Sequence, residues 1–156
     1  MSNNSEPGSA YWKLIDPIWH KVSFYKTWGI LQRDFTKISL KQKNLYAVHW
    51  ADSEICNGGF DQLFENSTGM LGPEAVEGYR AIGMQQCAEL VNQACLMLGV
   101  PYPRERAERQ KRLAILIASH PEGRDIFDEL EKQYYRLKYE ESGGLETAAD
   151  RYATSD

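Results

Sequence analysis

Residues 39–69 read SLKQKNLYAVHWADSEICNGGFDQLFENSTG, and they predict a central helix with a break near its end. Ser39 and Gln42 form the pattern of a capping box, in which each side chain satisfies an orphan backbone amide at the start of a helix. Apolar side chains then cover more than one side of the helix, which indicates a well-buried element. Asn57-Gly58-Gly59 should end the helix, because glycine readily adopts the left-handed conformation that closes a helix C-terminus.

Helical patterns continue on both sides of this segment. Towards the N-terminus, Asp16-Pro17 has the pattern of a helix start, and the spacing of Ile18, Val22, Tyr25 and Trp28 places them on one helical face. Towards the C-terminus, similar patterns predict helices within residues 72–98, 104–119 and 125–141.

No convincing period-2 run of β-branched residues is found. We therefore predict an all-α fold, a single compact multi-helix domain over residues 11–141. Residues 1–10 are polar and rich in Ser, Asn, Gly and Pro, so we expect them to be disordered. The segment 142–156 follows a Ser-Gly-Gly break, and we expect it to be a weakly ordered tail.

The composition limits the partners. A length of 156 residues fits one domain, and a net charge of −4 argues against direct binding to nucleic acid or to a membrane surface. Three cysteines without a C-x-x-C spacing, together with an N-terminus that lacks an apolar run, indicate a reducing compartment, so we expect a cytoplasmic protein.

Few residues indicate a catalytic or metal-binding site. His20, His49 and His120 are not spaced as metal ligands, Cys56 falls where a helix C-terminus disfavours a thiolate, and no phosphate-binding glycine motif is present. We therefore expect no catalytic residue, no metal and no cofactor. One enzymatic alternative stays open: carboxylates around His49, Asp52 and Asp61 would act together, and they would then share a deep polar pocket.

Acidic residues are the strongest signal. Lys and Arg are absent between Lys43 and Arg80, whereas six carboxylates fall in that interval: Asp52, Glu54, Asp61, Glu65, Glu74 and Glu77. They form a solvated face, a patch for a basic partner, or an acid/base pair. We expect a non-enzymatic protein-binding or regulatory module that presents this acidic surface to a protein partner with a basic surface. The basic run at residues 104–112 indicates ordinary surface pairing or, alternatively, a phosphate-binding helix.

The segment from Glu54 to Gly69 resembles a bacterial family of helical proteins of unknown function, whose best-known member is an acidic DNA mimic. The shared pattern is E-[VI]-x-N-G-G-F-x-Q-[YF]-F-x-N followed by a glycine turn, with Leu63 in place of the usual aromatic residue. A second block matches at Ile82-Gly83-Met84, with Met84 in place of the usual Ala. The resemblance spans about residues 40–98 and implies an all-helical fold and a binding role that resembles DNA mimicry towards a DNA-binding protein.

We interpret the motif itself as architecture, with Asn57, Gly58, Gly59, Phe60, Gln62, Phe64, Asn66 and Gly69 as its structural residues. In this interpretation the glycines connect two helices, the two Phe side chains fill the core, and the two amide side chains bond to backbone at the helix ends. Two alternative roles remain open. One is an immunity-type protein that neutralises a toxin, and the other is a homo-oligomer formed through the aromatic residues Phe127, Tyr134 and Tyr135.

Overall fold

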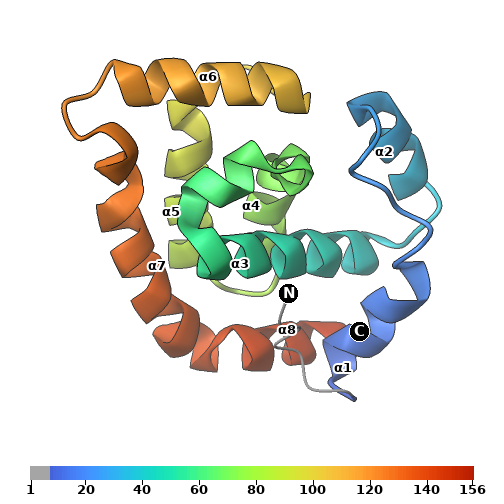
Figure 1. Ribbon diagram of the computed structural model, residues 1–156. Helices are drawn as coiled ribbons and strands as arrows, with labels where there is room; N and C mark the ends of the chain where they lie inside the picture. Colours follow the sequence, from blue (N-terminus) through green and yellow to red (C-terminus); the bar gives the residue numbers. More distant parts are fainter. Residues whose placement is uncertain (1–7) are drawn as a thin grey trace.

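Helix α3, Leu40–Glu65, lies at the centre of the molecule, and the other helices pack around it (Figure 1). The computed structural model describes residues 8–156, apart from the side chain of Arg124. Within these residues the chain forms eight α-helices and four short 3-10 helices, and no strand. The predicted all-α, single-domain fold is therefore confirmed.

The predicted capping box starts α3. The Ser39 hydroxyl accepts a hydrogen bond from the backbone N–H of Gln42 at 3.1 Å, and the Gln42 side chain accepts one from the backbone N–H of Ser39 at 3.0 Å. The predicted break is also present, but as a kink within the helix (Figure 1). Gly59 has φ 76° and ψ −172°, a conformation open almost only to glycine. The second half of α3 thus turns away from the first.

Helix α4, Gly72–Ala81, packs against α3, and α5, Gln85–Met97, packs against α4 in turn. The 3-10 helix η2, Ser67–Leu71, leads into α4, and a turn at Gly83 leads into α5. Helix α4 approaches α3 closely at Gly78, where an added Cβ would lie 2.6 Å from the carbonyl oxygen of Asn44. Glycine at this position therefore sets the distance between the two helices.

Three further helices frame α3. Helices α6 (Arg106–Ala118), α7 (Asp128–Glu140) and α8 (Leu145–Thr154) follow one another along the top, left and bottom of the view in Figure 1. The 3-10 helices η3 (Gly123–Phe127) and η4 (Glu141–Gly143) form the two corners. All three frame helices contact α3, so α3 is surrounded by segments that lie far apart in the sequence.

The N-terminal segment differs from its prediction. Helix α1, Ala10–Ile15, starts at a Ser9 cap, and Asp16-Pro17 opens only the 3-10 turn η1, Asp16–Ile18. A Thr27 cap then starts α2, Trp28–Phe35. The predicted helical face is therefore wrong: Tyr25 is 76% exposed, although Ile18 and Val22 are buried. Of the N-terminus predicted to be disordered, residues 1–7 lie outside the described residues.

The C-terminal segment is a helix rather than a weakly ordered tail. Leu145, Ala148 and Ala149 are buried at helical spacing, and α8 packs against α1. The backbone N–H of Tyr11 donates to the Asp150 carboxylate at 2.9 Å, which joins the two ends of the chain. Apolar contact with α1 stabilises a helix that is short on its own.

Large aromatic side chains fill the core, and those of Tyr46, Phe60, Phe64, Tyr79, Phe127 and Tyr134 are less than 2% exposed. Two of the three residues proposed for an aromatic oligomer face, Phe127 and Tyr134, are therefore core residues. The third, Tyr135, is 40% exposed and donates from its hydroxyl to the Ile55 carbonyl at 2.9 Å. Along residues 8–156, no helix is both long and apolar enough to cross a membrane.

Candidate functional site

The kink in α3 is built around the buried carboxylate of Glu54, which is 2% exposed. Its Oε2 atom accepts hydrogen bonds from the side-chain amides of Gln62 at 2.8 Å and Asn66 at 2.9 Å. These donors lie beyond Gly58 and Gly59, so Glu54 links the two halves of the helix. Burying a carboxylate is costly unless hydrogen bonds replace its water, and the two amides supply them.

This geometry changes the interpretation of the motif. Gln62 and Asn66 bind the Glu54 carboxylate, whereas we predicted that they would bind backbone at the helix ends. Phe60 and Phe64 are fully buried, as predicted. Glu54 was predicted to contact a partner, and this prediction is wrong because its carboxylate is enclosed by the protein. Asn57 is exposed at the kink.

A buried arginine closes the end of the same helix. Arg109 has no exposed surface, and its guanidinium donates to the carbonyls of Phe64 at 2.8 Å, Asn66 at 2.6 Å and Arg104 at 2.8 Å. Cationic donors at a helix C-terminus satisfy carbonyls that have no partner within the helix. Gly69 lies so close to this guanidinium that a Cβ would collide with it, which explains the glycine in the motif.

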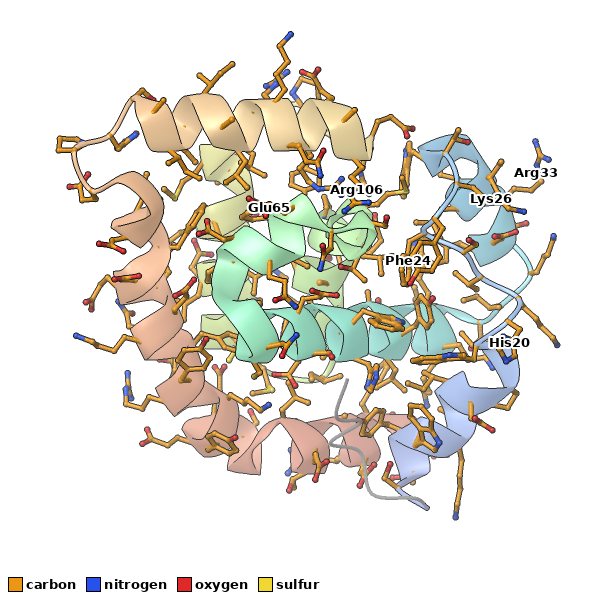
Figure 2. The ribbon with its side chains drawn as sticks, viewed as in Figure 1. His20, Phe24, Lys26, Arg33, Glu65 and Arg106 are labelled. Carbon is orange, nitrogen blue, oxygen red and sulfur yellow. The ribbon has the colours of Figure 1, made fainter. Side chains whose placement is uncertain are left out.

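Arginines in the basic run at residues 104–112 bind carboxylates and backbone carbonyls of the protein itself. Arg104 pairs with Glu74, Arg112 pairs with Glu108 at 3.0 Å, and Arg106 donates from Nε to the carbonyl of Glu65 at 2.8 Å. Figure 2 shows Arg106 and Glu65 where the start of α6 meets the end of α3. These contacts leave no continuous basic face, so they do not support a phosphate-binding helix.

The six predicted acidic residues do not share one surface. Besides the buried Glu54, Asp52 pairs with Lys138 at 2.9 Å and Glu74 pairs with Arg104, in contacts whose side chains are mostly buried. The prediction that these three face a partner is therefore wrong, because distant segments supply the cations that the local sequence lacks. The other three, Asp61, Glu65 and Glu77, are half-buried or exposed.

A second acidic surface lies where the kink of α3 meets the start of α7. Asp61 and Asp128 lie near Glu131, because both carboxylates act on its pKa, and Asp61 and Glu131 are half-buried. Asp125 and Glu129 are exposed close to Asp128 in the chain, in η3 and in the first turn of α7. We call these five residues the α7 acidic face. Its α7 members were not predicted, although residues 122–131 hold five acidic residues and one basic residue.

Repulsion within the α7 acidic face is detectable at Glu131. Burial, and then the nearby carboxylates of Asp128 and Asp61, raise the pKa of Glu131, while the hydrogen bond from the backbone N–H of Phe60 opposes that rise. Within residues 8–156, and leaving aside the side chain of Arg124, neither Asp125, Asp128, Glu129 nor Glu131 forms an ion pair. The carboxylates of Asp125, Asp128, Glu129 and Glu131 are therefore not neutralised by an ion pair with the described side chains.

The Asp52 carboxylate belongs to a hydrogen-bonded chain that leads out of the core. The hydroxyls of Tyr79 and Tyr134 lie 2.5 Å apart, and Tyr134 donates to Asp52 at 2.7 Å. Lys138 donates to Asp52 at 2.9 Å and to the Cys56 sulfur at 3.2 Å. Burial alone would lower the pKa of Lys138, but Asp52 holds it above its ordinary value. Lys138 is therefore a charged ammonium.

A cavity of about 420 Å³ opens beside this chain, between α3, the end of α7 and the start of α8. Its polar side chains include His49, Asp52, Ser53, Cys56, Asn57 and Lys138. His49 and Asp52 thus share a pocket, as the enzymatic alternative predicted, but Asp61 does not line it. In the part of the chain that the structure describes, no three His, Cys, Asp or Glu side chains converge as a metal site.

The titrating groups of the cavity are not poised for nucleophilic attack. Burial lowers the pKa of His49 to about 4 despite the attraction of Asp52, so its imidazole is neutral at neutral pH. Burial and the Asp52 carboxylate raise the pKa of Cys56 to about 11, although Lys138 acts in the opposite direction. A thiol with this pKa is protonated at neutral pH and is a weak nucleophile. At neutral pH the cavity is therefore lined by a neutral imidazole and a protonated thiol.

Comparison with known proteins supports the family resemblance. No match to a curated protein or to a solved structure reaches significance. The family model described as DMP19-like protein matches residues 36–155, which includes α3 with its Glu54-centred kink and every helix that follows. The chain therefore belongs to the DMP19-like protein family.

Proposed function

We propose that this protein is a helical binding module that presents the α7 acidic face to the basic surface of a partner protein. The observation that supports the proposal is that Asp125, Asp128, Glu129 and Glu131 form no ion pair within residues 8–156, leaving aside the side chain of Arg124. Burial, and then the nearby carboxylates of Asp128 and Asp61, raise the pKa of Glu131. The ionised form of such carboxylates is stabilised when a partner supplies Lys or Arg.

The geometry favours this surface over the interval that the sequence first indicated. Asp52, Glu54 and Glu74 are satisfied inside the protein, so a partner would have to break their contacts. The exposed carboxylates of Asp128 and Glu129 need no such rearrangement. A negative surface also steers a positively charged partner during diffusion, which raises the rate of association.

The partner class is a protein that carries a basic groove or patch, such as a DNA-binding protein. This is the sense in which the chain would act like a DNA mimic. Three unpaired cysteines, two of them buried, support a reducing cytoplasmic setting for that interaction. A toxin with a basic surface is the second candidate partner, because the same electrostatic complementarity would neutralise it.

Affinity capture from the native cell lysate, with and without charge reversal, tests the proposal. We expect Asp128→Lys combined with Glu129→Lys to abolish capture of the main partner. Capture by the wild-type chain should weaken as the salt concentration rises from about 50 to about 300 mM, because the Debye length shortens over that range. Mass spectrometry would identify the partner and show whether it is a DNA-binding protein or a toxin.

The matched control is Glu89→Lys combined with Glu108→Lys, two exposed acids outside the α7 acidic face. Glu108 lies in the first turn of α6 as Asp128 does in α7, so both double variants lose a similar helix-end interaction. Equal capture by both double variants would contradict the proposal.

A further inference from the structure

Helix α8 starts at the wall of the cavity without a side-chain cap. Its N-cap is Gly144, and the first bond of the helix runs from the Ala148 N–H to the Gly144 carbonyl at 2.9 Å. The backbone N–H groups of Leu145, Glu146 and Thr147 precede that bond, and these three residues line the cavity. A helix N-terminus carries a partial positive charge, so these amides favour an anionic acceptor.

His49 supplies an independent reason to expect a ligand. The side chain is 8% exposed and is held between the rings of Trp12, Trp19 and Trp50. Its Nδ1 atom lies 3.4 Å from the Tyr11 hydroxyl, and no described group bonds to its Nε2 atom. Because the nearly buried His49 side chain lines the cavity, its second ring nitrogen is available to a ligand bound there. The neutral ring offers one donor and one acceptor.

Lys138 adds a third feature. An ammonium has three N–H donors, and Lys138 uses two of them on Asp52 and the Cys56 sulfur. Ser53 also lines the cavity. Lys138 and the first backbone amides of α8 therefore offer donors at the α8 end of the cavity, whereas the neutral His49 ring can accept a hydrogen bond at the other.

We propose that this cavity binds a small carboxylate that also carries a hydrogen-bond donor, with the carboxylate at the α8 amides and Lys138 and the donor at His49. A volume of about 420 Å³ suits a metabolite-sized molecule. A phosphate dianion fits less well, because Lys138 is the one Lys or Arg among the described residues that line the cavity and it is already paired with Asp52. The same chemistry is found in free carboxylic acids and in the C-terminal residue of a peptide.

The test is an amide NMR titration of the full chain with N-acetylglycine, which has one carboxylate and one N–H donor. We expect saturable shifts at Leu145, Glu146 and Thr147, and binding at least about tenfold weaker for the neutral N-acetylglycinamide. A pentapeptide with a free C-terminus separates the two sources. Tighter binding than N-acetylglycine identifies a chain end as the natural ligand, and equal or weaker binding identifies a free acid.

Two variants keep the proposal falsifiable. Ser53→Phe places a ring in the cavity and should remove binding of N-acetylglycine, whereas Gln93→Phe, on the exposed side of α5, should leave the affinity unchanged. His49→Phe keeps an aromatic ring and should weaken binding about tenfold. Absence of saturable shifts in the wild-type chain, equal binding of N-acetylglycinamide, or full binding by Ser53→Phe would overturn the proposal.

Discussion

Asp52 and Glu54 lie two residues apart on α3 and have opposite surroundings. Two residues correspond to about 200° of helix rotation, so the side chains leave opposite sides of α3. Glu54 is 2% exposed and accepts hydrogen bonds from two neutral side-chain amides, one on its own helix and one at the helix C-cap. Asp52 bonds to Tyr134 and Lys138 from α7 and lines a cavity.

The difference separates architecture from a candidate binding site. The Glu54 contacts join residues within twelve positions of one another and maintain the kink. The Asp52 contacts span more than eighty positions and leave a charged ammonium and a neutral imidazole beside open space. We infer that the family motif specifies the shape of α3, whereas ligand and partner contacts lie on the sides of α3 that face α7 and α8.

The largest expected effect is at the enclosed carboxylate. Glu54→Ala should lower the free energy of unfolding by about 3–5 kcal/mol, because it leaves two buried amides without an acceptor and creates a cavity. Chemical denaturation at pH 7 measures the loss. Glu54→Gln keeps the volume and one acceptor oxygen, so it should lose less than half as much. Equal losses from the two variants would contradict the role given to the carboxylate.

On the cavity side, His49 should make stability depend on pH. Its folded pKa of about 4 lies below the usual 6.5, so the unfolded chain binds the proton more readily between those values. Stability should therefore fall as pH drops from 6.5 towards 4, by about 3 kcal/mol from this group. Urea denaturation at several pH values measures the slope. His49→Phe should flatten it, and an unchanged slope in that variant would exclude His49 as the source.

The two glycines of the kink provide a local comparison. Gly59→Ala should cost about 2–3 kcal/mol, because φ is 76° and an added Cβ would collide with the Glu131 carboxylate that caps Phe60. Gly58→Ala should cost about 1 kcal/mol, since φ is −155° and the main effect is to displace Gln62 from Glu54. Thermal unfolding measures both, and a reversed order would show that the kink is not set by Gly59.

The smallest expected effect is from removing the buried ion pair as a whole. Asp52→Leu combined with Lys138→Met should change the free energy of unfolding by only about 1 kcal/mol, because the loss of attraction is offset by the loss of two desolvation costs. Lys138→Met alone should cost about 3 kcal/mol, since it leaves the Asp52 charge without its partner. A double-mutant cycle measures the coupling, and additive losses would show that the two charges act independently.

The parts of the fold predicted from the sequence are those with local signals. The Ser39 capping box and the Gly58-Gly59 break depend on residues a few positions apart, and both are present. The α8 helix carried a similar signal in the spacing of Leu145, Ala148 and Ala149, but its stability depends on contact with α1, at the other end of the chain. Contacts between residues so far apart in the sequence cannot be predicted from the spacing of neighbouring apolar residues.

The candidate site was harder to predict, for the same reason. The interval from Lys43 to Arg80 lacks cations in sequence, yet Arg104 and Lys138 enter it in space and neutralise Glu74 and Asp52. The cavity needs α1, α3, α7 and α8 together, so no single segment indicates it. The N-terminal error has another cause: Phe24 packs on Trp50 through an irregular segment, and aromatic spacing does not distinguish that from a helix.

Asp52 belongs to the candidate binding site and Glu54 to the architecture of α3, and two measurements on one pair of variants test this separation directly. The affinity for N-acetylglycine and the free energy of unfolding would be measured for Ser53→Phe and Glu54→Gln. We predict that Ser53→Phe abolishes binding and stays folded, and that Glu54→Gln is less stable yet binds within about twofold of the wild-type chain. Loss of binding by a folded Glu54→Gln chain, with binding retained by Ser53→Phe, would contradict the account.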